Sequence, residues 1–172
     1  MKTINSIKIK TLDQIAGVSV EARKVGKKVG LITGCFDVIH VGHVELFQFA
    51  KKHCDVVVVG LDSDETIKLN KGPARPIHNI SQRERVLAEL ESVDLVFRII
   101  GRVDFGADLA YRKYWELTKV IKPNYLITNP VADRFWGEKE KRAAEFGAKL
   151  LKISGKMNIS STRIIKFFTR EF

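Results

Sequence analysis

Two histidines, His40 and His43, stand three residues apart just after the short apolar run Val29–Gly34. Apolar residues recur at helical spacing from Val41 onward, so both histidines are predicted on the first turn of a helix, with side chains roughly 5–6 Å apart. Gly42, between them, leaves room for a ligand, and the unpaired amides of a helix start attract anions. Because imidazole N–H groups are further donors, we interpret this segment as a phosphate-binding loop.

Other roles for these histidines are weighed against that interpretation. A single histidine here would more often cap the helix or fill the core, but two around a glycine, directly after a strand, favour a ligand. Two histidines on one helical face can also bind zinc. A third ligand is lacking, because Asp37 precedes the turn and Glu45 is expected to point elsewhere. We therefore predict no metal site built by the protein.

A second cluster of donors lies near the end of the chain. It consists of three hydroxyls with a cation on either side: Lys156, Ser160, Ser161, Thr162 and Arg163. Hydroxyls, cations and the amides of a helix start all suit phosphate oxygens. Alone, the cluster could equally be the N-cap of the last helix. Together with the histidine loop it suggests a nucleoside triphosphate held at both ends.

Strands and helices alternate along the chain in a way that would bring these segments together. Short apolar runs predict strands at Val29–Gly34, Asp55–Leu61, Leu95–Ile100, Tyr125–Thr128 and Lys149–Ile153. Periodicity and breaker signals predict helices at Thr11 to Val25, Val41 to His53, Leu109 to Ile121, Ala132 to Phe146 and Ser160 to Arg170. Five βα units indicate an α/β fold with a doubly wound, Rossmann-like, five-stranded parallel sheet. Ligands bind such sheets beyond the carboxyl ends of the strands.

One more helix is expected between the second and third strands. Ser81 and Glu84 have the spacing of a capping box, which would start the helix. Its inward residues are expected to be Val86, Leu87, Leu90 and Val93. We expect a single domain over residues 1–172, with an N-terminal helical extension at 1–28 and the Rossmann-like core at 29–172.

Composition argues against a disordered chain and a membrane-spanning one, and the distribution of charge argues against a nucleic-acid-binding protein. The 172 residues are 45% hydrophobic, too apolar for a disordered chain, and they contain no run long enough for a membrane span. The two cysteines, Cys35 and Cys54, are expected to be reduced thiols, and the protein cytoplasmic and without a membrane partner. The net charge of +10 would suit nucleic acid. However, residues 1–28 carry 7 basic and 2 acidic side chains, residues 29–133 carry 13 and 14, and residues 134–172 carry 10 and 4. The predicted core is thus near neutral, and no nucleic-acid partner is expected.

Three motifs together resemble a known family. They are Gly34-Cys-Phe-Asp37, His40-Val-Gly-His43 and Ile159-Ser-Ser-Thr162. In this combination they are similar to the cytidylyltransferase-like nucleotidyltransferase superfamily. Within it the likeness is greatest to the heptose-1-phosphate adenylyltransferase (ADP-heptose synthase) group, through the leading helix, the histidine loop, Asp62–Glu65, and Lys71–Ile77 with Arg83. The chain departs from that group at Thr128–Asp133, where the group has a Lys-Gly-Gly-Asp-like segment that helps to choose the base, so ATP and CTP both stay open.

The resemblance implies a role for each motif residue. His40, His43 and Arg163 would be catalytic. Nucleotide-binding residues would be Gly34, Cys35, Phe36, Asp37, Gly42, Thr128, Lys156, Ser160, Ser161 and Thr162. Asp37 is expected to order the histidine loop rather than bind metal, and Trp136 to stack on the base or to belong to the core.

The expected reaction transfers AMP or CMP from a nucleoside triphosphate to a small phosphorylated acceptor and releases pyrophosphate. A sugar-1-phosphate is the first expectation for the acceptor, with glycerol-3-phosphate or a phospho-amino-alcohol as alternatives. Lys71 and Arg75, in an expected flexible loop, are candidates for binding its phosphate. Mg²⁺ would be bound mainly through the nucleotide phosphates. The family implies a possible homodimer, and a non-catalytic nucleotide- or RNA-binding module is the alternative of another class.

Overall fold

The computed structural model describes residues 5–106, 108–154 and 159–168. Within these ranges the first half of the chain forms α1 (Asn5–Lys8), α2 (Leu12–Lys24), β1 (Val29–Gly34), α3 (Val41–His53), β2 (Val56–Asp62), α4 (Asp64–Lys71) and α5 (Ile80–Glu89). The second half forms β3 (Leu95–Ile99), α6 (Asp108–Ile121), β4 (Tyr125–Thr128), α7 (Trp136–Glu145), β5 (Lys149–Lys152) and α8 (Ser161–Phe168).

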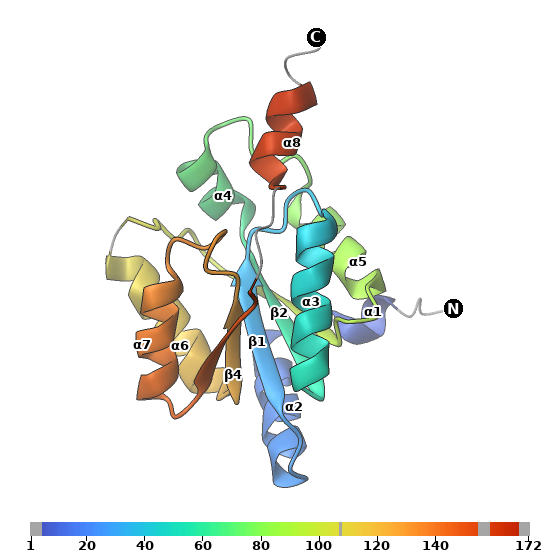
Figure 1. The fold of residues 1–172 in the computed structure, drawn as a ribbon, viewed down its shortest axis with the longest axis vertical. Coiled ribbons are helices and arrows are strands. Elements are labelled where there is room, and N and C mark those ends of the chain that lie inside the picture. Colours follow the sequence, from blue (N-terminus) through green and yellow to red (C-terminus); the bar gives the residue numbers. More distant parts are fainter. Residues whose placement is uncertain (1–4, 107, 155–158, 169–172) are drawn as a thin grey trace.

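The five strands form one parallel sheet in the order β3-β2-β1-β4-β5. The chain builds outward from β1 to β3 and then returns to place β4 on the other side of β1. This reversal confirms the predicted doubly wound, Rossmann-like sheet. The carboxyl ends of the strands lie at one edge of the molecule, where α4 and α8 also stand (Figure 1). The division into an extension at 1–28 and a core at 29–172 stays a prediction.

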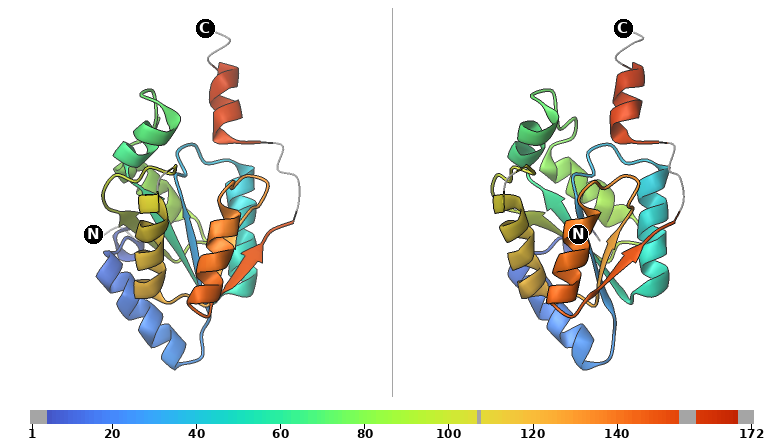
Figure 2. Two further views of the ribbon diagram at one scale, coloured as in Figure 1. Left: turned by 90° about the vertical axis from the view of Figure 1, so that its left-hand side faces the viewer. Right: turned by 60° about the vertical axis from the view of Figure 1, so that its left-hand side comes forward.

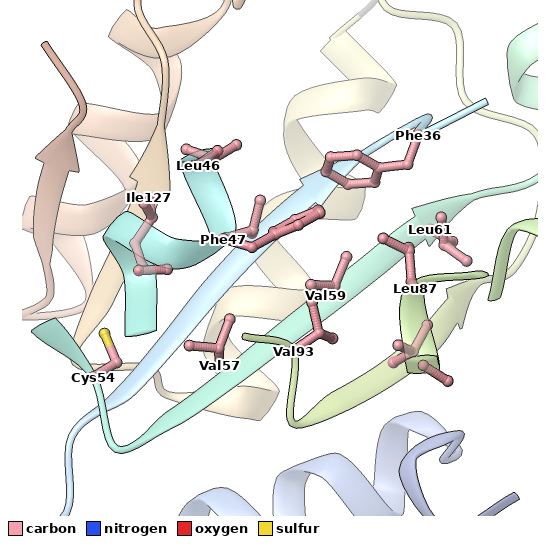
Figure 3. Close-up of a cluster of buried hydrophobic side chains, with 14 residues drawn as sticks. Phe36, Leu46, Phe47, Cys54, Val57, Val59, Leu61, Leu87, Val93 and Ile127 are labelled. Atoms are coloured by element: carbon pink, nitrogen blue, oxygen red, sulfur yellow. The ribbon is translucent and has the colours of Figure 1, made fainter. Parts of the chain in front are cut away.

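Alternate residues of the central strands feed two separate apolar layers. Ile32 packs with α3 and α5 on one face, whereas its neighbour Leu31 packs with α2, α6 and α7 on the other. The two further views show the helices divided in this way around the sheet (Figure 2). On the first face the rings of Phe36 and Phe47 lie together, and β2 side chains approach Leu87 of α5 (Figure 3). Covering both faces explains why the strands are apolar runs rather than alternating ones.

The start of one helix agrees with the sequence signal and the start of another does not. Helix α2 was expected from Thr11, and Thr11 and Gln14 form a capping box at its start. The expected box at Ser81 and Glu84 is wrong, because α5 begins two residues earlier, where Asn79 and Gln82 make the reciprocal bonds. The earlier start matches the observed burial, in which Arg83, Glu84, Leu87 and Ala88 face inward. Val86, expected inside, is therefore exposed.

Two other segments also differ from expectation. The expected flexible loop after β2 is in part a helix, α4, whose N-cap Ser63 accepts a hydrogen bond from the amide of Thr66. Helix α7 begins at Trp136 rather than at Ala132, because Asn129 closes a turn there by accepting the amides of Ala132 and Asp133 at its carbonyl. Both differences reshape the edge of the sheet at which the candidate site lies.

A buried arginine joins the loops at this edge. Arg83 is 1% exposed, and its guanidinium donates to the carbonyls of His78, Cys35 and Asp62. It also forms an ion pair with Asp64 at 2.7 Å. A carbonyl buried without a donor is costly, so Arg83 stabilises the loops after β1 and β2 together. The role of Arg83 in this structure is therefore structural.

Replacing this arginine by an apolar chain of similar length should destabilise the fold. We expect Arg83→Met to lower the free energy of unfolding by about 3 kcal/mol or more, because several buried acceptors lose their donor at once. Arg85→Met, an exposed position on the same helix, should change it by about 0.5 kcal/mol or less. Urea unfolding of the three proteins measures both values, and equal stability of the two variants would contradict this role.

Candidate active site

One open cleft of about 960 Å³ lies beyond the carboxyl ends of β1, β2 and β4. It is centred on the point between β1 and β4 where the strand order reverses, the usual ligand site of such sheets. Of the residues singled out from the sequence, those that line it are Gly34, Cys35, His40, His43, Lys71, Thr128, Ser160, Ser161 and Thr162. Both expected phosphate-binding segments therefore face one space.

The histidine loop carries its two rings stacked against each other. The ring centroids of His40 and His43 are 3.8 Å apart at an interplanar angle of 25°. Phe36 supports them from behind: it is buried, adopts a positive φ of 46°, and meets the ring of His43 edge-on at 5.2 Å. Gly34 permits this placement, because a Cβ there would lie 3.2 Å from the Phe36 ring.

Burial keeps both imidazoles uncharged at neutral pH. It lowers the pKa of His43 to about 3, with the positive charges of His40 and Lys71 acting in the same direction. Burial also lowers the pKa of His40. The Nδ1 atoms of both rings are buried without a hydrogen-bond partner in the described part of the chain. The rings are thus neutral donors and acceptors that a ligand can satisfy.

Asp37 holds this loop against the segment after α4. Its carboxylate accepts hydrogen bonds from Arg75 Nε at 2.5 Å and from the amides of Ile77 and His78 at 2.8 and 2.9 Å. Burial alone would raise the pKa of Asp37, but these amides and the guanidinium outweigh it and hold the pKa below its ordinary value. Its lone pairs are taken up by the protein, which confirms that Asp37 orders the loop.

The same ion pair corrects the expectation for Arg75. Its side chain is 9% exposed and faces Asp37, and Arg75 does not line the cleft. The structure gives it a positioning role instead of a contact with the acceptor. Lys71, at the last turn of α4, does line the cleft.

The start of α8 closes the other side of the cleft. Ser161 Oγ donates to the carbonyl of Val38 at 2.8 Å, which ties this helix directly to the histidine loop. Ser160 Oγ accepts the amide of Arg163 at 3.2 Å and so caps the helix. Arg163 is exposed and is not part of the cleft wall that the structure describes. Lys156 lies outside the described residues.

The segment Thr128–Asp133, at which the chain departs from the heptose-1-phosphate adenylyltransferase group, forms a compact turn in the wall of the cleft. Asp133 accepts Thr128 Oγ1 at 2.6 Å and Lys139 Nζ at 2.7 Å. Burial would raise the pKa of Asp133, but Lys139 and these hydrogen bonds lower it overall. Asn129 is 3% exposed, and its Nδ2 has no partner among the residues described. A buried donor facing the cleft is available to a ligand atom.

Four residues missed by the sequence reasoning as site residues form the floor or wall of the cleft: Asp62, Tyr114, Asn129 and Arg142. Asp62 carried a signal, since it ends a strand that is otherwise apolar at the edge where ligands bind. Asn129 belongs to the segment Thr128–Asp133 at which the chain departs from the adenylyltransferase group. Nothing in the local pattern marks Tyr114 and Arg142, because α6 and α7 bring them in from distant parts of the chain.

Comparison with known proteins agrees with this geometry. The sequence model of the cytidylyltransferase-like family matches residues 31–167. This chain belongs to the cytidylyltransferase-like family. The match covers both motifs that line the cleft, and it confirms the family resemblance that the motifs indicated.

The sequence matches to two curated relatives cover most of this chain. Over 126 residues, or 73% of this chain, it is 39% identical to the bifunctional protein HldE of Aliarcobacter butzleri (strain RM4018). Over 161 residues, or 92% of this chain, it is 34% identical to the bifunctional protein HldE of Desulfatibacillum aliphaticivorans. The matches span only 24% and 30% of those two proteins.

Two solved structures share the fold. The lipopolysaccharide core biosynthesis protein of Thermoplasma volcanium GSS1 matches with a TM-score of 0.58 at 23% identity, over 76% of this chain and 99% of that one. Pantoate-beta-alanine ligase of Francisella tularensis, solved with an ATP analogue and beta-alanine, matches with a TM-score of 0.65 at 18% identity, over 96% and 78%. Such distant likeness supports the architecture of the cytidylyltransferase-like domain.

The structure also gives the outcome for Trp136 and for the metal, membrane and cysteine expectations. Trp136, expected as a base-stacking surface or core residue, does not line the cleft, and Lys152 Nζ lies 4.1 Å from its ring centroid.

Among the described residues there is no group of three or more histidine, cysteine or acidic side chains that could hold a metal. In the same ranges, no helix is long and apolar enough to cross a membrane. Cys35 and Cys54 are both free thiols.

The buried, neutral state of His43 predicts a dependence of stability on pH. Its pKa is about 3 in the folded state and 6.5 ordinarily, so between these values the unfolded chain binds a proton that the folded chain does not. Stability should therefore fall as the pH drops from 6.5 to 4.5. We expect the wild type to lose about 2 kcal/mol more than His43→Gln over this interval. Urea unfolding at both pH values measures the difference, and parallel losses would contradict the buried neutral imidazole.

Proposed function

We propose that this chain is a nucleotidyltransferase that moves AMP or CMP from a nucleoside triphosphate to a small phosphorylated acceptor and releases pyrophosphate. One observation carries the proposal. The histidine loop and the start of α8 line the same cleft and are joined by the hydrogen bond from Ser161 Oγ to the carbonyl of Val38. A triphosphate of extended shape could contact both segments at once.

In the proposed reaction an acceptor phosphate oxygen attacks the α-phosphorus of the nucleotide. The new oxygen–phosphorus bond forms as the bond from the α-phosphorus to the bridging oxygen of pyrophosphate breaks, and that oxygen keeps the electron pair. An ionised phosphate needs no general base, so catalysis consists of positioning and charge stabilisation. His40 and His43 would donate hydrogen bonds to the α-phosphate, where negative charge accumulates.

The remaining cleft residues fit the other parts of the substrates. Ser160, Thr162 and the amides at the start of α8 would hold the β- and γ-phosphates, with Arg163 nearby and Lys156 as an expected second cation. Lys71 would bind the acceptor phosphate, since its charge acts on both His43 and Cys35. Thr128 and its turn would contact the base.

Mg²⁺ is expected to arrive with the nucleotide as part of the substrate. Asp37 of the histidine loop and Asp133 of the turn after β4 are already engaged by protein donors. Neither is free to displace water from the ion. The residues present therefore fit a metal coordinated mainly by phosphate and water, which would neutralise phosphate charge.

The proposal also covers the chemical class of the acceptor, the cellular location and the oligomeric state. The sequence likeness to the heptose-1-phosphate adenylyltransferase group, together with the HldE relatives, favours a sugar-1-phosphate acceptor, as in ADP-heptose synthesis. Glycerol-3-phosphate and phospho-amino-alcohols are the alternatives. The near-neutral core argues against a nucleic-acid partner. A cytoplasmic location and a homodimer stay predictions.

Pyrophosphate release tests the proposed reaction. Each of ATP, CTP, GTP and UTP is offered with Mg²⁺ and with sugar-1-phosphates of six and seven carbons, glycerol-3-phosphate or ethanolamine phosphate. We expect release only when nucleotide and acceptor are both present. His43→Ala should reduce the rate about 10²- to 10³-fold, the usual effect of removing one preorganised donor.

A matched control is provided by the same helix. His53→Ala changes an exposed histidine at the far end of α3 and should keep the wild-type rate. Full activity of His43→Ala would refute the role of the histidine loop. Tight RNA binding that weakens steeply with salt, without pyrophosphate release from any pair, would instead favour a non-catalytic binding module.

A further inference from the structure

A chain of polar groups, with the buried Asp62 at its centre and the half-buried Tyr114 and Cys35 on either side, crosses the floor of the cleft next to the histidine loop. Tyr114 of α6 donates its hydroxyl to Asp62 Oδ1 at 2.5 Å, and Cys35 Sγ lies 3.5 Å from Asp62 Oδ2. Asp62 is 2% exposed, and all three residues line the cleft. Burial raises the pKa of Asp62, although the hydrogen bonds from Tyr114 and Cys35 oppose it. A buried carboxylate is costly for stability, which suggests that it serves a ligand.

Asp62 has hydrogen-bonding capacity that the protein does not use. An ionised carboxylate can accept about four hydrogen bonds, and only Tyr114 and Cys35 donate to this one among the described side chains. Arg142, which lines the same cleft, has the complementary property: a hydrogen-bond donor without an acceptor among the described residues. It is 3% exposed, and its Nε is buried without an acceptor within the described ranges. Its guanidinium carbon lies 5.5 Å from the centroid of the Tyr114 ring.

This cluster lies beside the phosphate end of the cleft. The charge of Lys71 lowers the pKa of both His43 and Cys35, although burial and Asp62 raise that of Cys35 overall. Cys35, Lys71 and Asp62 all line the cleft, and Cys35 Sγ lies 3.5 Å from Asp62 Oδ2. An acceptor whose phosphate is bound near Lys71 and His43 would extend its carbon chain over Cys35 toward Asp62 and Tyr114.

The charges around Asp62 discriminate between the acceptor classes. Lys139 and Arg83 both act on its carboxyl but are ion-paired with Asp133 and Asp64, whereas the guanidinium of Arg142 lies over the Tyr114 ring. An ammonium group could pair with Asp62, but the charge of Arg142 would repel it, and it could not accept a hydrogen bond from Arg142. A hydroxyl is neutral, donates to a carboxylate and accepts from a guanidinium. It would satisfy both unused groups together.

We propose that Asp62, Tyr114 and Arg142 bind hydroxyls on the carbon chain of the acceptor and so select a polyhydroxylated phosphate over an amino-alcohol phosphate. The proposal rests on the nucleotidyl transfer proposed above, because it assigns the acceptor end of that cleft. It makes these three residues the determinants of acceptor class, separate from the groups that hold the triphosphate.

Binding ratios test the assignment without requiring turnover. The full chain, with Mg²⁺ and α,β-methylene analogues of ATP and CTP, is titrated calorimetrically with sugar-1-phosphates of six and seven carbons, ethanolamine phosphate and ethyl phosphate. We expect the wild type to bind a sugar-1-phosphate at least about 10-fold more tightly than ethyl phosphate, and ethanolamine phosphate no more tightly than ethyl phosphate. In Asp62→Asn and Tyr114→Phe the preference for the sugar should fall about 10-fold, with the affinity for ethyl phosphate unchanged.

Two controls separate binding from a structural role. Asp13→Asn, exposed on α2, and Tyr125→Phe, outside the cleft, should keep the wild-type ratio. The free energy of unfolding of Asp62→Asn should not fall, because the substitution removes a buried charge. A large loss of stability in Asp62→Asn, with the sugar preference intact, would overturn the proposal in favour of a structural role.

The remaining outcomes also decide the matter. The proposal is overturned if the wild type binds sugar and ethyl phosphates equally, if it prefers ethanolamine phosphate, if it binds none of the three classes, or if both variants keep the preference. A wild type that prefers the sugar but releases no pyrophosphate would contradict the proposed reaction and leave this assignment standing. Pyrophosphate release without sugar preference would do the reverse.

Discussion

Asp37 receives hydrogen bonds from Arg75 and from two successive amides of the segment that follows α4. Through these bonds the loop after β1 is fastened to the loop after β2. The stacked histidines stand on the first of these loops, and α8 is bonded to the same loop through Val38. The position of the histidine loop, and through it that of the start of α8, therefore depends on one buried carboxylate and its donors.

The cleft next to the histidine loop contains polar groups that have no hydrogen-bond partner among the described residues. Both imidazoles are half-buried and neutral. Their Nδ1 atoms, and nitrogens of Asn129 and Arg142, are buried without a hydrogen-bond partner among the described residues. Buried polar atoms are normally paired, so a concentration of unpaired ones in one cleft has a cost that binding would recover. The stability of the fold comes instead from the apolar layers on both faces of the sheet and from anchors such as Arg83.

The sequence contained most of the architecture and the part of the site that lies close together along the chain. Apolar runs and breakers located the five strands to within a residue or so, and the two motifs located the two segments that line the cleft from β1 and from α8. Local patterns misplaced Arg75, because its partner Asp37 is 38 residues away. They also placed the start of α5 at Ser81, since a second capping pair, Asn79 and Gln82, stands two residues before it. The floor of the cleft was missed because only the folded topology brings Tyr114 of α6 to Asp62 at the end of β2 and packs α7 against β4 and β5.

The account makes one central claim, that the histidine loop binds the α-phosphate of a nucleotide whose β- and γ-phosphates are bound by the start of α8. Equilibrium binding of the triphosphate and the monophosphate of one nucleoside, with Mg²⁺, to His43→Ala and Thr162→Val tests it most directly. Thr162 is suited to this because it is exposed in the cleft wall. The account predicts that His43→Ala weakens the binding of both nucleotides, whereas Thr162→Val weakens only that of the triphosphate, by about 10-fold. Equal weakening of both nucleotides by Thr162→Val, or no effect of either substitution, would contradict it.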